Sequence, residues 1–170
     1  VSLNDHLLFA AYPRASGHFA PHTDGATRQG LNVRSFYSVI IYLNDTEGGG
    51  ETRFYEDEAA SKPVFDHGRW TARDRFVTAD VQPKRGRVLV FHQSRVHEGR
   101  PTVGDTQKYI IRSDVLFARQ PPVFDQPHER RAYKDYEDAL EAAADGHHDE
   151  AQRLFDSARR LCPDLAAALG

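Results

Sequence analysis

The first 125 residues alternate between short apolar, β-branched runs and turn residues, and this pattern most constrains the fold. Three runs are typical of buried strands: residues 35–43, 87–92 and 109–117. Weaker candidates are residues 7–12, 19–22, 52–54 and 76–81. Gly, Pro, Asn and Asp lie between the runs, and no helical spacer separates them. A parallel sheet needs such spacers, so we predict a mainly β sandwich or barrel.

Residues 128–170 have a different composition, rich in Ala, Glu, Asp, Arg and Leu, which predicts helices. Four residues occupy the offsets of the second half of a tetratricopeptide repeat: Ala151, Phe155, Ala158 and Pro163. Gly146 suits the turn between two helices, but the first-half aromatic and Leu-Gly positions are not filled. A single repeat cannot bury its own apolar face. We therefore expect a domain at 1–125 and a helical, repeat-like hairpin at 128–170 that covers it.

Composition argues against several classes of partner. The net charge is −3 and the pI about 6.3, so neither nucleic acid nor a membrane surface is favoured. Cys162 is the only cysteine, which favours a reducing compartment, and we expect a cytoplasmic protein. The chain enters its motifs directly after Val1, so we expect the full protein to have an earlier segment and this domain to lack its N-terminal part. The oligomeric state is not indicated.

The chemistry-bearing pattern is His22-Thr23-Asp24, followed 73 residues after Asp24 by His97. Residues i and i+2 of a strand point to the same face, so His22 and Asp24 can reach one ion. Two imidazoles and a carboxylate leave coordination positions open, as iron(II) requires when it binds a co-substrate and oxygen together. The spacing alone is a weak signal. His92 is an alternative second histidine, but its place at a strand end favours a packing role.

Several further motifs occur in a fixed order around these residues. They are Tyr12-Pro13, Gly17 and Phe19; Tyr42-Leu43-Asn44; Glu47-Gly48-Gly49-Gly50-Glu51-Thr52; Pro83 to Phe91; His97-Glu98-Gly99; and Lys108-Tyr109. Together, over residues 3–118, they resemble the prolyl-4-hydroxylase-like branch of the 2-oxoglutarate/Fe(II)-dependent dioxygenases.

The resemblance implies a double-stranded β-helix, which is a jelly-roll or cupin-like fold. It also implies Fe(II), with 2-oxoglutarate and O2 as co-substrates and ascorbate as a further candidate. The implied reaction decarboxylates 2-oxoglutarate to succinate and CO2 and hydroxylates an unactivated carbon. Related halogenases replace the carboxylate with a small residue, so Asp24 favours hydroxylation.

The resemblance also assigns the 2-oxoglutarate pocket. Lys108 occupies the family's basic position, and Tyr42 matches a tyrosine whose hydroxyl assists the far carboxylate. Thr52 and Tyr12 match further pocket positions. Strand parity places Ile40 on the face of Tyr42, together with Ser38 and Phe36.

The same parity places Ile110, Arg112 and Asp114 on the face of Lys108. A buried Arg and Asp are costly unless they are paired or used, so they either pair with each other or hold a polar substrate. Relatives with peptide substrates tend to carry an aromatic residue at the position of Asp114, which puts peptidyl-proline in doubt. His18 and Arg34 are candidate residues of the rim.

Several alternatives remain open from the sequence. The substrate is an amino acid, a small metabolite or a protein, and the same cofactors also support desaturation, cyclisation or demethylation. A non-catalytic binding or sensing module and a cupin-type metal enzyme without 2-oxoglutarate are further rivals. Residues 57–74 have little periodicity, and we expect a long surface loop there.

Overall fold

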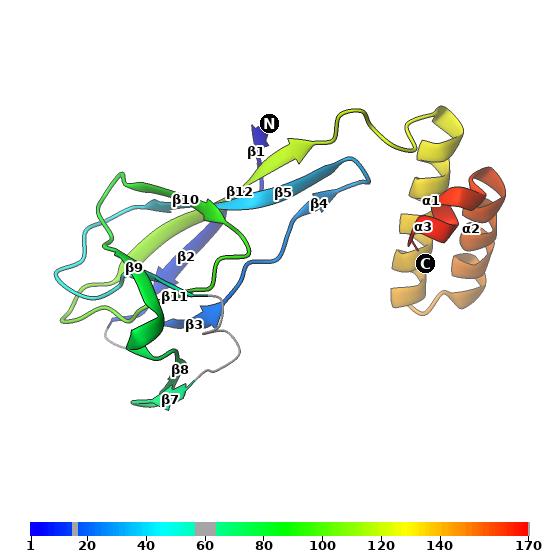
Figure 1. Cartoon of the computed structure of the whole chain (residues 1–170). Helices are drawn as coiled ribbons and strands as arrows, with labels where there is room; N and C mark the ends of the chain where they lie inside the picture. Colours follow the sequence, from blue (N-terminus) through cyan, green and yellow to red (C-terminus); the bar gives the residue numbers. More distant parts are fainter. Residues whose placement is uncertain (15–16, 57–63, 170) are drawn as a thin grey trace. The chain divides into compact units, whose positions relative to one another are not determined.

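The computed structural model describes residues 1–14, 17–56 and 64–169 (Figure 1). The chain forms two compact units. The first contains Val1–Thr27 and Arg34–Phe117, and the second contains Arg28–Val33 and Ala118–Gly170.

The first unit contains two main antiparallel sheets. The larger sheet has the order β1 (Ser2–Leu3), β12 (Lys108–Ala118), β5 (Val33–Tyr42) and β10 (Val88–His92), and β2 (Leu8–Tyr12) also pairs with β12. The smaller sheet has the order β3 (Phe19–His22), β11 (His97–Gly99), β6 (Thr52–Tyr55) and β9 (Val77–Val81). The seven strands expected from the sequence are all present, and the prediction of a mainly β, jelly-roll fold is confirmed.

The two sheets face each other across an apolar core. Ile40, Tyr42, Phe91 and Ile110 from the larger sheet pack with Phe54 from the smaller sheet. Alternation along β5 buries Ser38, Ile40 and Tyr42 on this inner face. This alternation aims the polar residues of the inner face at the space between the sheets.

Residues 64–76 differ from the expected loop. Val64–Asp66 (β7) and Arg69–Thr71 (β8) form a hairpin, which is followed by a short 3-10 helix at Asp74–Phe76. His67 and Gly68 both have positive φ (47° and 79°), as a tight hairpin turn requires. Strands of three residues are too short to show periodicity, which explains why the sequence predicted a loop instead of this hairpin. Residues 57–63 of the expected loop lie outside the described part of the chain.

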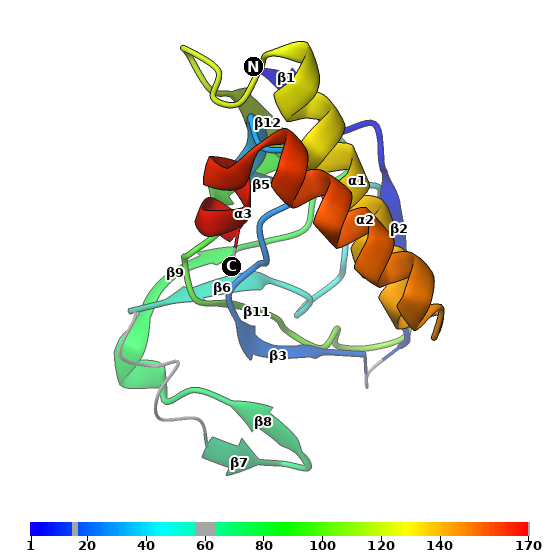
Figure 2. The same ribbon diagram turned by 90° about the vertical axis from the view of Figure 1, so that its right-hand side faces the viewer.

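The second unit contains β4 (Arg28–Gln29) and three helices: α1 (Pro127–Ala144), α2 (His148–Leu161) and α3 (Pro163–Leu169). Gln126 and Glu129 form a capping box at the start of α1, where Pro127 suits the first turn. Figure 2 shows α1 and α2 side by side, as the prediction of a helical hairpin requires. The sequence did not predict α3. Among the described residues, no helix is both long and apolar enough to cross a bilayer.

Candidate active site

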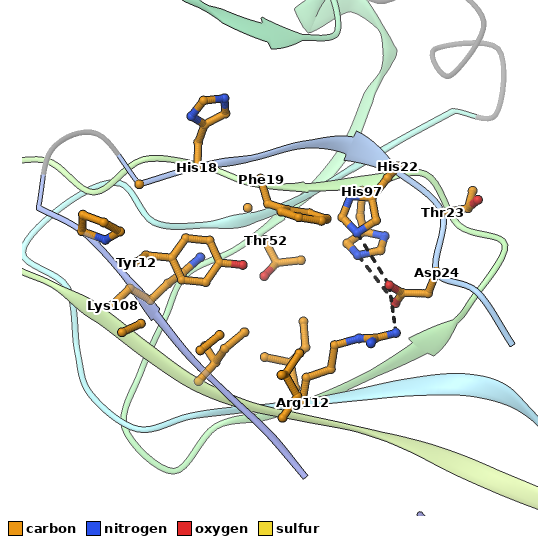
Figure 3. A pocket seen from close by; sticks show the side chains of 18 of the residues that line it. Tyr12, His18, Phe19, His22, Thr23, Asp24, Thr52, His97, Lys108 and Arg112 are labelled. Atoms are coloured by element: carbon orange, nitrogen blue, oxygen red, sulfur yellow. Dashed lines mark ion pairs between the residues drawn. The ribbon is translucent and has the colours of Figure 1, made fainter. Parts of the chain in front are cut away.

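Three candidate metal ligands lie together at one end of the space between the sheets (Figure 3). His22 ends β3 and His97 begins β11, and these two residues are direct partners in the pairing of the strands. Asp24 follows two residues after His22. The ligand atoms of all three side chains lie within 4.8 Å of one another. Residues far apart in the sequence thus offer one ion two imidazoles and a carboxylate.

Each imidazole is oriented by a carbonyl group two residues before it. His22 Nδ1 lies 2.7 Å from the oxygen of Ala20, and His97 Nδ1 lies 3.0 Å from the oxygen of Arg95. A carbonyl oxygen only accepts hydrogen bonds, so both Nδ1 atoms must carry the proton. The lone pair of each ring is therefore on Nε2. His22 Nε2 lies 3.6 Å from Asp24 Oδ1, and His97 Nε2 lies 3.8 Å from Asp24 Oδ2. This is the tautomer that a metal requires.

Asp24 is fixed as a carboxylate. Ser38 Oγ donates a hydrogen bond of 2.5 Å to its Oδ2, and its backbone N–H donates to the oxygen of Gln93. Burial alone would raise the pKa of Asp24, but its neighbours His22, Ser38, His97 and Arg112 lower it to about 2. The group is therefore ionised and available as a ligand at neutral pH.

The three ligands line a cavity of about 620 Å³ between the two sheets. Figure 3 shows Lys108 and Tyr12 at one end and Asp24 and Arg112 at the other. The remaining walls are mainly apolar and include Leu8, Ala10, Phe19, Ile40 and Ile110. A concave, largely apolar space with a few converging polar groups is typical of a site for small molecules.

Lys108 is a buried cation, with only 1% of the residue exposed, and its charge is little compensated by its surroundings. Its Nζ donates a hydrogen bond to the oxygen of Gly50 (3.0 Å) and lies 3.8 Å from the ring centre of Tyr12. Burial lowers the pKa of the ammonium to about 8, and the charge of Glu51 only partly opposes this. None of the described carboxylates forms an ion pair with it. A buried ammonium in this state is suited to bind an anion.

The other residues expected at the 2-oxoglutarate pocket lie at different depths. Tyr12, Ile40 and Thr52 line the cavity. Tyr42 is completely buried behind this wall, and its hydroxyl donates to Thr52 Oγ1 at 2.6 Å. Tyr42 thus bonds a residue of the cavity wall, and a role of its hydroxyl in binding the co-substrate stays a prediction.

The substrate candidates separate into two groups. Arg112 and His18 line the cavity, and Arg112 Nη2 lies 3.0 Å from Asp24 Oδ1 and 3.6 Å from Asp114 Oδ1. Asp114 is buried and is not among the described lining residues. Arg34 also lies outside that set, with its guanidinium over the ring of Phe36.

The model of one protein family, described as the 2OG-Fe(II) oxygenase superfamily, matches residues 7–113, which is more than half of the chain. The chain belongs to this superfamily. The matched segment contains the three ligands, Lys108 and Arg112. The family's cofactors are Fe(II), 2-oxoglutarate and O2, and the donor set of His22, Asp24 and His97 fits that iron.

Solved structures similar to this oxygenase include three hydroxylases. A prolyl-4-hydroxylase from Pseudomonas putida is 21% identical, with a TM-score of 0.41 over 66% of this chain and 51% of the other. A Trichoplax adhaerens prolyl hydroxylase, solved with a peptide fragment of hypoxia-inducible factor, is 18% identical, with a TM-score of 0.45 over 73% and 49%. A prolyl 4-hydroxylase from Phytophthora capsici is 16% identical, with a TM-score of 0.44 over 98% and 65%.

The oxygenase chain thus spans about half the length of the first two of these structures. No curated protein sequence matches it.

Sequence reasoning missed several side chains that position this oxygenase's site. Ser38 was expected on the inner face, but not as the donor that holds Asp24. Thr27 and Gln93, which bond Asp114, gave no signal, because the contacts join segments far apart in the chain. Leu8 and Ala10 could have been found from the alternation in residues 7–12, had its partner strand been known.

Proposed function

We propose that this oxygenase uses Fe(II), 2-oxoglutarate and O2 to hydroxylate an unactivated carbon, with release of succinate and CO2. The observation that carries the proposal is the presence, in one cavity, of the His22-Asp24-His97 cluster and of the buried Lys108 ammonium, which forms no ion pair with a described carboxylate. The ligand cluster alone, or the buried lysine alone, could serve another function. Together they match a co-substrate that binds iron at one end and carries a free carboxylate at the other.

The residues of the chain have distinct roles in this proposal. His22 and His97 would hold the iron through Nε2, and Asp24 would supply the charged ligand. Lys108 would bind the far carboxylate of 2-oxoglutarate in a charge-assisted hydrogen bond, while the ring of Tyr12 and the backbone of Gly50 keep its ammonium in place. The bound iron would supply the oxidising chemistry when 2-oxoglutarate and O2 are present. The apolar walls would limit the access of water.

Binding of 2-oxoglutarate to Mn(II)-loaded protein tests the proposal without knowledge of the substrate. Calorimetry should show binding to the wild type, and Lys108→Ala should weaken it roughly 10- to 100-fold, as expected for the loss of a hydrogen bond to a charged group. Lys84→Ala, which removes an exposed lysine, is the matched control. Failure of the metal-loaded wild type to bind 2-oxoglutarate would favour a cupin-type metal enzyme.

The ligands themselves are tested separately. His22→Ala, Asp24→Ala and His97→Ala should each weaken metal binding and abolish the 2-oxoglutarate-dependent release of succinate. Full release by any one of these variants would contradict the assignment. Product analysis would separate hydroxylation from desaturation, cyclisation and demethylation, because the same ligand set supports all four.

A further inference from the structure

Two cations enter the cavity from the same face of β12. Lys108 and Arg112 both line it, and Ile110 lies between them. Four residues of strand separate their Cα atoms by about 13 Å, at about 3.3 Å per residue. The charged ends do not converge, because Arg112 reaches towards Asp24, away from Lys108 (Figure 3). The cavity therefore has two separate positions for anions.

One molecule of 2-oxoglutarate is too short to use both positions fully. Its two carboxyl carbons are about 5 Å apart, since four C–C bonds of about 1.5 Å join them. In the proposed function its far carboxylate is bound by Lys108. Arg112 is then left for an anionic group of a second molecule.

Arg112 retains donors for such a group. A guanidinium carries five N–H donors in a planar fork. The closest contacts to Asp24 and Asp114 are both made by Nη2, and none of the described residues accepts a hydrogen bond from Nε or Nη1. The side chain of Arg112 is 29% exposed, so these donors can be reached from the cavity.

The guanidinium is also held in place before any ligand binds. Asp114, which lies 3.6 Å from Arg112, is itself fixed by Thr27 Oγ1 (2.6 Å) and Gln93 Nε2 (3.0 Å). Asp24 anchors the same Nη2 from the other side. A side chain whose rotamer is already fixed loses less conformational entropy than a free one when it binds a carboxylate in a bidentate contact.

The wall next to Arg112 is apolar. Leu8 is the direct partner of Arg112 across the β2-β12 pair, and Ala10 is the partner of Ile110. Both line the cavity. The site therefore presents a cation beside a hydrocarbon surface, close to the candidate iron ligands.

We propose that Arg112 binds the carboxylate of the primary substrate, and that this substrate is a small monocarboxylic acid, with free amino acids as the first class to test. The inference rests on the proposed function and names its substrate class. The backbone in the interior of a peptide chain offers only neutral amides, which cannot form a charge-assisted pair with a guanidinium. The apolar part of the acid would lie against Leu8 and Ala10.

The test uses protein loaded with Mn(II) and 2-oxoglutarate. Two pools of probes are added, the common L-amino acids and their carboxamides, and binding is followed by ligand-observed NMR. One or more acids should bind, and the matching amides should bind roughly 10- to 100-fold more weakly. Arg112→Gln should lose the preference for acids yet still bind Mn(II) and 2-oxoglutarate. Arg85→Gln, at an exposed arginine, should behave as the wild type.

Three results would overturn the proposal: equal binding of acids and amides, no binding from either pool, or loss of Mn(II) or 2-oxoglutarate binding in Arg112→Gln. The last result would show that Arg112 serves Asp24 or the co-substrate instead. If the wild type does not bind 2-oxoglutarate, the proposed function fails. The comparison of acids and amides on protein loaded with Mn(II) alone would then still decide the role of Arg112.

Discussion

The carboxylate of Asp24 accepts a short hydrogen bond from Ser38 on the opposite sheet. Ser38 lies on β5 of the larger sheet, whereas Asp24 follows β3 of the smaller one. Groups that orient a metal ligand from behind commonly change metal affinity when they are removed. At this scale, the serine fixes the direction in which the ligand oxygen points.

Ser38→Ala should therefore weaken Mn(II) binding about 10-fold or more. Ser113→Ala is a suitable control, because Ser113 is also buried and also donates one hydrogen bond, to the oxygen of Asn4. Both variants should lose about 1 kcal/mol of stability. Equal metal affinity in the two variants would show that Ser38 does not orient Asp24.

Lys108 predicts a pH dependence of 2-oxoglutarate binding. Burial lowers the pKa of its ammonium to about 8, and only the charged form attracts a carboxylate. Affinity should therefore begin to fall as the pH rises above about 8, and it should level off above the higher pKa that the ammonium has when the anion is bound. Lys108→Arg keeps its charge over this range and should give a flat profile, if it folds. Calorimetry at several pH values checks both, and a flat wild-type profile would contradict the prediction.

Individual residues were predictable from sequence where a motif or strand parity fixes them. His22, Asp24, Lys108 and Arg112 all lie on the expected cavity. The depth of Tyr42 was not predictable, because its distance from the cavity depends on the side chain of Thr52 on another strand. Strand parity predicts the face on which a side chain lies. It does not predict whether a side chain from another strand lies between that residue and the cavity.

At the scale of elements, the glycine-rich turn before β6 shapes the pocket through its backbone. Gly50 N–H donates to the oxygen of Pro101, Val103 N–H donates to the oxygen of Gly48, and Gly50 presents its own oxygen to Lys108. Gly49 has φ of 66°, and a Cβ at this position would clash with the Pro101 carbonyl. The turn thus requires glycine for two separate reasons, its backbone angle and the lack of space.

Gly49→Ala and Gly68→Ala separate these two reasons. Gly68 also has a positive φ, but a Cβ there would meet nothing within 4 Å. Gly68→Ala should cost about 1–2 kcal/mol from backbone strain alone. Gly49→Ala should cost about 1–3 kcal/mol more, because it also crowds the core of the turn. Urea denaturation measures both, and equal losses would show that the backbone of residues 101–103 moves away at little cost.

Long strands were predictable because ten or eleven residues show a clear period, as in β5 and β12. The residue pattern alone did not predict the three-residue strand β11, which carries His97. Its residues, His-Glu-Gly, have no β-branched or apolar pattern, and their pairing with β3 and β6 defines the strand. Such short strands form because neighbouring strands pair with them, and not because their own residues prefer an extended conformation.

At the scale of the whole molecule, the site belongs to one of the two units. Residues 28–33 belong to the second unit, where Asn32 bonds the backbone of Val123 and Arg119. The sequence predicted the change to helices near residue 128, but not that this earlier segment would join them. That assignment depends on contacts across about ninety residues of chain, which local patterns do not contain.

A fragment that ends at Ala118 should therefore retain the affinities for Mn(II) and 2-oxoglutarate, because the ligands and Lys108 lie in the first unit. Its melting temperature should be lower, since Asn32 and Leu31 lose the partners that they have in the second unit. Calorimetry and thermal denaturation would measure these two effects. Loss of metal binding in a folded fragment would show that the helices contribute to the site.

The direct pairing of His22 with His97 also orders the events by which the holoprotein forms. The nascent chain has no complete site for an ion, because the second imidazole joins His22 and Asp24 only after β3 and β11 have aligned. Metal uptake therefore follows sheet assembly and then reinforces it by mass action, since an ion that binds only the folded state raises its population. A shift of the two strands by one residue would turn one imidazole away from the other. An ion that needs both imidazoles thus favours the register in which His22 faces His97.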